Sequence, residues 1–397
     1  MKTPPARLLD VTRLVRRAGQ VMTGVDRVEL AYLEALSDAQ VPCWGIARTR
    51  LGYVLLAPHG LAHLRGAARG HVPWPTPKGV ARLDRGTRTG AQAALTLIRR
   101  HAAARCLPYG LGRMLARHMP PGTHYVNVGH SNLTQRMLSA AQRMRGKIAV
   151  FVHDIIPVEF PQYQRDGTAQ SFAAKLKIVR AYADLLICNS HDTARRLLDI
   201  MADWGPVPEV IVSHLGTERA APRRDDLPPH LPPNGPYFVC LGTIEPRKNH
   251  ALLLDIWEDL DPPVPTLVIA GRRGWNNADV FARLDALSSG GAVIEAPGLS
   301  DGAVAALLQG ARALLFPSRA EGYGLPAMEA AALGVPVIAS DLPALREVLE
   351  NIAVYASPTD RYSWKKAILD HAAHGKEAPK FAPPTWQAHF KTVLTKV

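Results

Sequence analysis

Short apolar runs alternate with amphipathic stretches in the second half of the chain. Five runs, each ending in a small or polar residue, predict buried strands at 237–242, 266–271, 292–296, 313–318 and 335–340. The segments between them have helical periodicity, and the clearest is bounded by Ser300 as an N-cap and Gly310 as a stop. Continuous apolar strands that alternate with helices predict a parallel sheet covered on both faces.

The first half shows the same alternation less regularly. It predicts strands at 124–129, 147–154, 184–190 and 209–216 and helices at 25–36, 171–183 and 191–201. Residues 57–120 have helical stretches without clear alternation, so their fold is not predicted. Proline and polar residues are dense over 220–236, which is typical of a linker.

This pattern predicts an α/β protein with two Rossmann-like, doubly wound domains. We expect the first domain at 1–219 and the second at 237–380, with the linker between them. A length of 397 residues agrees with two domains on size alone. Ligands of such sheets bind at the carboxyl ends of the strands, so the site should lie in a cleft between the domains.

Composition narrows the class of protein. The four cysteines are scattered without a CxxC pair, so neither a zinc site nor a disulfide framework is indicated, and a reducing compartment fits. No apolar run reaches the 18 or so residues that a membrane span needs, and the N-terminus has no signal-peptide core. We therefore expect a soluble cytoplasmic protein.

The net charge of +13 is unevenly distributed. Residues 57–120 contain eleven Lys or Arg and a single acid, Asp84. Such a segment attracts polyanions: a nucleic acid, an anionic membrane surface or a phosphorylated lipid. It is equally typical of a solvated basic face. No aromatic residues are interleaved with the basic ones in the manner of nucleic-acid-binding motifs, so we expect no nucleic-acid partner.

Two acids flank a glycine-rich loop in the stretch FPSRAEGYGLPAMEAAALGVPVIASD (316–341). Glu321 precedes Gly322 and Gly324, which let the backbone approach a ligand, and Glu329 is placed on the first turn of the following helix. A helix N-terminus suits phosphate, and carboxylates suit sugar hydroxyls. The pattern predicts a nucleotide-sugar site. The same sequence is also compatible with two solvated acids, with Glu329 as a favourable charge near the helix N-terminus.

Three other short motifs fall at predicted strand ends. GTIEPRKNH (242–250) places Arg247 and Lys248 before a helix, where they could neutralise a diphosphate leaving group. VFVHDIIP (150–157) ends a buried strand with His153 and Asp154, an active-site pair or a simple capped turn. MTGVDRVE (22–29) places Gly24 before a helix, as a second phosphate contact or an ordinary turn.

Taken together, these motifs resemble family 4 glycosyltransferases, retaining enzymes with the two-domain GT-B fold. The resemblance covers nearly the whole chain. EGYGLPAME is similar to the family's Glu-seven residues-Glu motif, followed here by AxxxGxPVIASDxPxxxEV; TGVDR, HDxIP, CNS (188–190), SHLG (213–216) and GTIEPRKN add support. The motif GTIEPRKN is similar to the form found in bacterial mannosyl- and rhamnosyltransferases. TWQAHFKTVL (385–394) resembles the family's final helix, so we expect 381–397 to pack back on the first domain.

The resemblance implies a role for each matching residue. Glu321 would contact the donor sugar, Glu329 the ribose, and Arg247 and Lys248 the diphosphate. His153 would lie over the sugar, with Asp154 helping to place the acceptor. The remaining donor-site residues would be Gly24, Pro297, Gly298, Leu299, Gly322, Tyr323, Gly324 and Leu325. Many members have Gly-Arg where this chain has Gly242-Thr243, which leaves the role of Arg247 less certain than that of Lys248.

The resemblance further implies transfer of a hexose from a nucleotide diphosphate sugar with retention, without metal or cofactor. The GTIEPRKN form favours mannose or rhamnose, with GDP-mannose as the favoured donor. The acceptor would be a saccharide, free or on a polyprenyl diphosphate, in cell-surface polysaccharide synthesis, with the enzyme peripheral on the inner face of the cytoplasmic membrane. The alternatives are a related enzyme with a soluble acceptor, a non-hydrolysing epimerase, and a catalytically inactive nucleotide-sugar scaffold.

Overall fold

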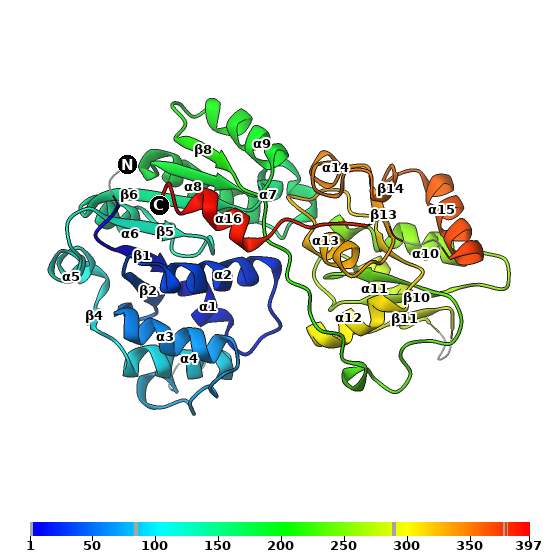
Figure 1. Ribbon diagram of the computed structural model, residues 1–397, viewed down its shortest axis with the longest axis horizontal. Helices are drawn as coiled ribbons and strands as arrows, with labels where there is room; N and C mark the ends of the chain where they lie inside the picture. Colours follow the sequence, from blue (N-terminus) through cyan, green and yellow to red (C-terminus); the bar gives the residue numbers. More distant parts are fainter. Residues whose placement is uncertain (1–2, 83–85, 288–290, 376–377, 379) are drawn as a thin grey trace.

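The computed structural model describes residues 3–82, 86–287, 291–375, 378 and 380–397. Within these residues the strands form two sheets, with orders β4-β3-β2-β1-β5-β6-β7-β8 and β11-β10-β9-β12-β13-β14. The two sheets lie in separate halves of the molecule (Figure 1).

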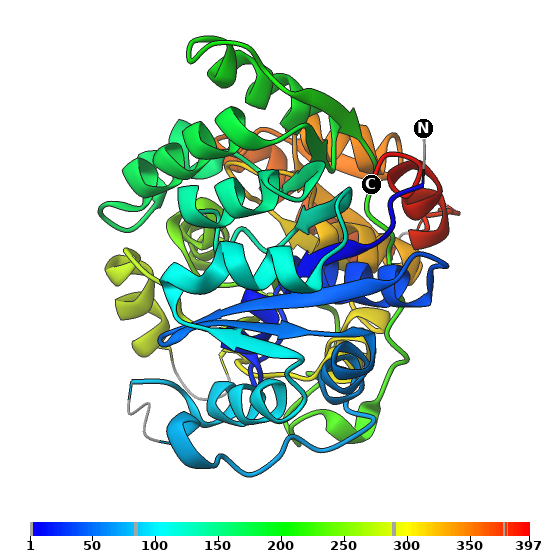
Figure 2. The same ribbon diagram turned by 90° about the vertical axis from the view of Figure 1, so that its left-hand side faces the viewer.

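The first sheet contains β1 (Arg7–Asp10), β2 (Cys43–Thr49), β3 (Gly52–Leu56), β4 (Ala104–Cys106), β5 (Thr123–Asn127), β6 (Arg145–Val152), β7 (Leu185–Cys188) and β8 (Glu209–Val212). Its helices are α1 (Thr12–Arg17), α2 (Gly24–Asp38), α3 (Pro58–Ala68), α4 (Thr89–Arg100), α5 (Leu111–His118), α6 (Gln135–Gln142), α7 (Ile156–Glu159), α8 (Thr168–Tyr182) and α9 (His191–Ala202). Figure 2 shows helices on both sides of this sheet.

The second sheet contains β9 (Tyr237–Leu241), β10 (Thr266–Ala270), β11 (Val293–Glu295), β12 (Ala313–Phe316), β13 (Val337–Ser340) and β14 (Ala353–Ala356). Its helices are α10 (His250–Glu258), α11 (Ala278–Asp285), α12 (Asp301–Gln309), α13 (Leu325–Ala332), α14 (Pro343–Leu349) and α15 (Arg361–His374), and α16 (Trp386–Val393) follows. Short 3₁₀ turns are η1 (Gly79–Ala81), η2 (Pro108–Gly110), η3 (Pro161–Tyr163), η4 (Arg224–Asp226) and η5 (Pro246–Lys248).

The second sheet is parallel throughout its described strand pairs, as the apolar runs predict. The first sheet departs from that pattern at one edge, where β3 runs antiparallel to both β2 and β4. This edge lies within and just before the segment 57–120, whose fold the sequence did not predict. Ser300 caps α12 as expected, since its hydroxyl accepts the Ala303 N–H at 3.1 Å.

The facing sides of the two sheets share one apolar cluster. It contains Phe151 from β6, Tyr323 from the loop before α13, and Phe390 from α16. The C-terminal segment returns to the first sheet: the Tyr32 hydroxyl lies 2.9 Å from His389 Nε2, and Arg7 Nη2 donates to the Val397 carbonyl at 2.8 Å. Figure 1 shows α16 against the first half of the molecule. This shared packing fixes the two strand-end edges opposite one another.

Candidate active site

A cavity of about 450 Å³ lies at the carboxyl ends of the strands, between the two domains. The start of α2 closes it from the first domain, and the loops after β9, β10 and β11 together with α13 close it from the second. Its lining includes Gly24, Arg27, Gly242, Gly298, Leu299, Asp301, Leu325 and Glu329. The cleft predicted from the sheet pattern is therefore present.

Glycines keep the strand ends of the second sheet open. Gly242 follows β9 with φ +140°, in the region that favours glycine. A Cβ on Gly271, after β10, would lie 1.8 Å from the Gly242 carbonyl oxygen. The two loops can run this close only because Gly271 has no side chain, and both glycines line the cavity.

Glu321 lies between Arg247 and Lys248, and none of these three is among the described residues that line the cavity. Lys248 Nζ is 2.6 Å from Glu321 Oε1, and Arg247 Nη1 is 2.9 Å from the same oxygen. Glu321 is only 8% exposed and Lys248 only 9%. Burial alone would raise the pKa of Glu321, but Arg247 and Lys248 outweigh that effect and hold it at about 2. Glu321 is thus an ionised, fixed hydrogen-bond acceptor.

Arg247 and Lys248 are oriented by the short turn η5 and the residues around it. Arg247 also donates to Glu245 Oε1 and to the Ala320 carbonyl, both at 2.8 Å. The Lys248 ammonium lies 4.4 Å from the centre of the Phe316 ring, a cation–π contact. Burial lowers the pKa of Lys248, against the opposing influence of Glu321. These contacts keep both cations in place without a ligand.

Gly322 brings the glycine-rich loop into direct contact with the first domain. A Cβ at this position would lie 2.4 Å from the His153 carbonyl oxygen and 2.8 Å from Asp154 Cβ. The Gly322 carbonyl accepts hydrogen bonds from Ser190 Oγ at 2.9 Å and Thr193 Oγ1 at 3.1 Å. The absence of a side chain therefore allows the motifs around 153 and 321 to meet.

His153 is buried, and its ring is oriented by the backbone. Its Nε2 lies 2.6 Å from the Val128 carbonyl, which can only accept, so Nε2 carries the proton. Burial and the neighbouring His130 hold the pKa of His153 well below its usual range. The neutral ring therefore has Nδ1 as its remaining acceptor. Burial raises the pKa of the adjacent Asp154, with Arg247 opposing the change.

Glu329 lies in the second turn of α13, because the helix begins at Leu325; the expected place in the first turn was wrong. It forms an ion pair across the cleft with Arg27 of α2, and Arg27 Nη2 also lies 2.7 Å from Asp301 Oδ1. The Glu329 side chain is 17% exposed, and burial raises its pKa. Neither Glu321 nor Glu329 is a solvated surface acid, so that alternative is excluded.

Of the other expected donor-site residues, some line the cavity and others lie outside its lining. Gly24, Gly298, Leu299 and Leu325 line the cavity, and a Cβ on Gly24 would lie 3.1 Å from Leu325 Cδ1. Gly324 precedes α13 with φ +90°. Tyr323 and Pro297 do not line the cavity. The Tyr323 hydroxyl donates a hydrogen bond to the Leu215 carbonyl at 2.8 Å, and Pro297 is exposed.

Sequence reasoning missed Arg27, Asp301 and Glu245. Arg27 stands inside the quoted TGVDR motif, but a cation on the first turn of a helix looks like an ordinary surface residue. Its partner Glu329 is 302 residues away in the chain. Glu245 lies within GTIEPRKNH, and nothing in that motif indicates that its carboxylate pairs with Arg247 two residues later.

Residues 223–379 match the family described as glycosyl transferases group 1. They form a glycosyl transferases group 1 domain. The match confirms, for the second domain, the family resemblance carried by the Glu-seven residues-Glu motif.

Several relatives at the sequence level are mannosyltransferases by name, and two others are named D-inositol 3-phosphate glycosyltransferase. The chain is 32% identical over 260 residues to the serotype-specific mannosyltransferase WbdA of Escherichia coli, a match that covers 59% of this chain and 31% of WbdA. It is 34% identical over 135 residues to the O-antigen chain mannosyltransferase RfbU of Salmonella typhimurium, covering 33% and 37%. The chain thus spans about a third of the length of these relatives.

Similar solved structures span almost the whole chain. Sucrose-phosphate synthase from Thermosynechococcus elongatus has a TM-score of 0.61 at 15% identity, covering 98% of this chain and 97% of that one. HepE from Anabaena, solved with UDP, has a TM-score of 0.61 at 15% identity and covers 99% and 95%. At these identities the likeness concerns the fold, and the chain has the GT-B fold that the resemblance implied.

No helix among the described residues is long and apolar enough to span a membrane.

Proposed function

We propose that the chain is a retaining glycosyltransferase that moves a hexose, with mannose or rhamnose favoured, from a nucleotide diphosphate sugar to a saccharide or lipid-linked saccharide. The observation that carries the proposal is the buried group of Glu321, Arg247 and Lys248 at the strand ends of the glycosyl transferases group 1 domain. The names of the O-antigen mannosyltransferase relatives support cell-surface polysaccharide synthesis and GDP-mannose as the first donor to test.

The donor would bind with its sugar against Glu321 and its ribose near Glu329. An ionised carboxylate accepts charge-assisted hydrogen bonds from sugar hydroxyls. The two cations hold the pKa of Glu321 at about 2, so Glu321 is ionised at neutral pH, and they also fix its position. Glu329 is held in the cavity by Arg27, so a ribose would bind beside this ion pair or displace Arg27 from it.

The leaving diphosphate would be stabilised by fixed positive groups. Arg247 and Lys248 provide formal charge, and the N-terminus of α13, opened by Gly324, provides backbone N–H groups. Such preorganised groups stabilise charge that develops as the bond to the sugar breaks. The neutral ring of His153 and the side chain of Asp154 lie next to this loop through Gly322, where they would orient the sugar and the acceptor.

A membrane-bound acceptor would meet the enzyme through the basic segment 57–120. Two of its arginines are already paired with acids outside the segment: Arg65 with Asp38, and Arg69 with Glu34 and Glu218. The remaining charge would attract anionic lipid. Retention of the protein by vesicles containing anionic lipid, lost at high salt, tests this part; no retention at low salt would refute it.

A donor screen tests the proposed function. GDP-mannose, dTDP-rhamnose, UDP-glucose, UDP-galactose and UDP-GlcNAc would each be added to the purified protein, and thermal stabilisation and slow release of nucleotide measured. We expect one donor to stabilise the wild type and Glu321→Ala and Lys248→Ala to lose both effects. Glu258→Gln is the matched control, because it removes a carboxylate from an exposed ion pair with Arg283 in the same domain.

The outcomes distinguish the alternatives. Stabilisation by a donor without turnover, with acceptors present, would favour a nucleotide-sugar-binding scaffold. Turnover with water-soluble acceptors and no need for lipid would favour a GT-B enzyme with a soluble acceptor. If no donor stabilises the protein, the proposed function is wrong.

A further inference from the structure

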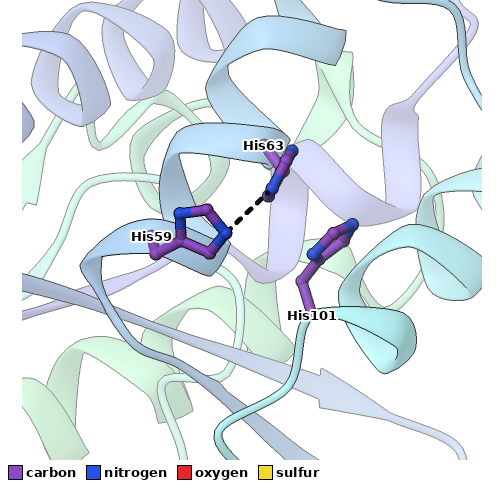
Figure 3. Close-up of side chains that lie close together, drawn as sticks. All are labelled: His59, His63 and His101. Carbon is purple, nitrogen blue, oxygen red and sulfur yellow. Dashed lines mark hydrogen bonds between the residues drawn. The ribbon is translucent and has the colours of Figure 1, made fainter.

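Three histidines from separate parts of the basic segment come together on the first domain. His59 and His63 lie four residues apart on α3, and His101 follows α4. Figure 3 shows the three rings turned toward one another. Each offers a ring nitrogen, and these nitrogens all lie within 4.8 Å of one another. No histidine of the group is among the described residues that line the cleft cavity.

The geometry points to a binding site for a divalent transition metal, with zinc as the best fit, held by His59, His63 and His101. Nε2 of His63 lies 3.2 Å from Nε2 of His59. Two imidazole nitrogens at zinc-ligand distances of about 2.0–2.1 Å in a tetrahedron are about 3.3 Å apart. The first pair therefore already has the spacing of two zinc ligands, on one face of a helix at positions i and i+4.

His101 supplies the third ligand from another element. Its ring stacks on His63 with centroids 3.8 Å apart, and one of its nitrogens lies within 4.8 Å of a nitrogen of each of the other two rings. The backbone of His101 can lie close to α3 because Gly60 has no side chain. A Cβ on Gly60 would lie 2.5 Å from the His101 carbonyl oxygen. Gly60, between the two helical histidines, thus lets the chain after α4 approach α3. A bound metal would clamp α3 to that segment.

The ligand chemistry favours soft-to-borderline metals over Mg²⁺ or Ca²⁺. Imidazole nitrogen binds zinc, copper and nickel, whereas the hard cations prefer oxygen. His59 is exposed and the other two are half-buried, which leaves a fourth position open to water. A metal binds the neutral form of each imidazole. Arg100 immediately precedes His101 and would repel a bound cation, so the affinity should be modest.

Zinc titration of the tag-free, EDTA-treated protein, followed by isothermal calorimetry and thermal unfolding, tests the site. We expect one zinc per chain and a rise in the unfolding temperature, with Mg²⁺ giving neither. His59→Ala, His63→Ala and His101→Ala should each weaken binding by roughly tenfold or more. His71→Ala, an exposed histidine of the same segment, is the matched control and should bind like the wild type.

A second measurement guards against misfolding of the variants. Without zinc, each variant should unfold at nearly the wild-type temperature, because the side chains removed are partly exposed. X-ray absorption at the zinc edge should show three nitrogen ligands from histidine. No binding by the wild type, or binding that survives loss of His63, would overturn the proposal and leave a cluster held by ring stacking and one hydrogen bond.

Discussion

Replacing Glu321 with glutamine removes one negative charge from a buried group and changes almost nothing in shape. In the wild type, Lys248 Nζ and Arg247 Nη1 lie 2.6 and 2.9 Å from the same carboxylate oxygen. All three side chains are mostly shielded from water: counted for the side-chain atoms alone, the exposed fractions are 9% for Glu321, 11% for Lys248 and 18% for Arg247. The Glu321→Gln variant therefore leaves two cations without the charge that compensates them.

The pKa shift of Glu321 and the cost of breaking buried ion pairs in other proteins give the same magnitude for this loss. A carboxyl whose pKa falls from 4.5 to about 2 on folding contributes about 3 kcal/mol to the free energy of unfolding at pH 7. Breaking a buried ion pair by removing one partner costs about 3–5 kcal/mol in other proteins. We therefore expect Glu321→Gln to lower the free energy of unfolding by about 3 kcal/mol at pH 7.

The pH dependence separates this electrostatic loss from a packing defect. The folded pKa of Glu321 is depressed, so its stabilisation is present above pH 4.5 and is lost as the pH falls toward 2. The difference between wild type and variant should shrink to about half by pH 3. Urea unfolding at pH 7, 4 and 3 measures it, with Glu258→Gln as the exposed control. A difference below about 1 kcal/mol at pH 7, or one that does not change with pH, would refute the reasoning.

Three further substitutions test the contacts around the site. Gly322→Ala forces a Cβ against the His153 carbonyl. We expect the free energy of unfolding, measured with urea, to fall by about 1–3 kcal/mol, and most glycosyl transfer to be lost. Unchanged turnover would show that the two domains need not meet at this residue. Tyr323→Phe removes the donor to the buried Leu215 carbonyl and should cost about 1–3 kcal/mol with little change in donor affinity, measured by titration. Ser300→Ala removes the N-cap of α12 and should lower the free energy of unfolding by about 1 kcal/mol. An unchanged free energy of unfolding would mean that another group accepts the hydrogen bond from the Ala303 N–H.

The strands that the sequence predicts are the continuous apolar ones. β9, β10, β12 and β13 are buried on both faces, so nearly every position is apolar and each strand can be recognised in the sequence as a continuous apolar run. β14 was not predicted because only its last residue is buried. β2 and β3 were missed because β2 carries Gly45 and an exposed Arg48, and because an antiparallel edge has no βαβ pattern to reveal it.

The sequence by itself determined the parallel second sheet, the glycine-rich loop and the two acids at its ends, because each depends on residues that are neighbours in the chain. Only the tertiary structure decided which charges face each other. Lys248 pairs with Glu321 across 73 positions and Arg27 with Glu329 across 302. Such pairs leave no local pattern, since a cation's partner depends on how distant segments pack, within the second domain for Lys248 and between the two domains for Arg27. The same is true of the three histidines that α3 and the end of α4 bring together in the first domain.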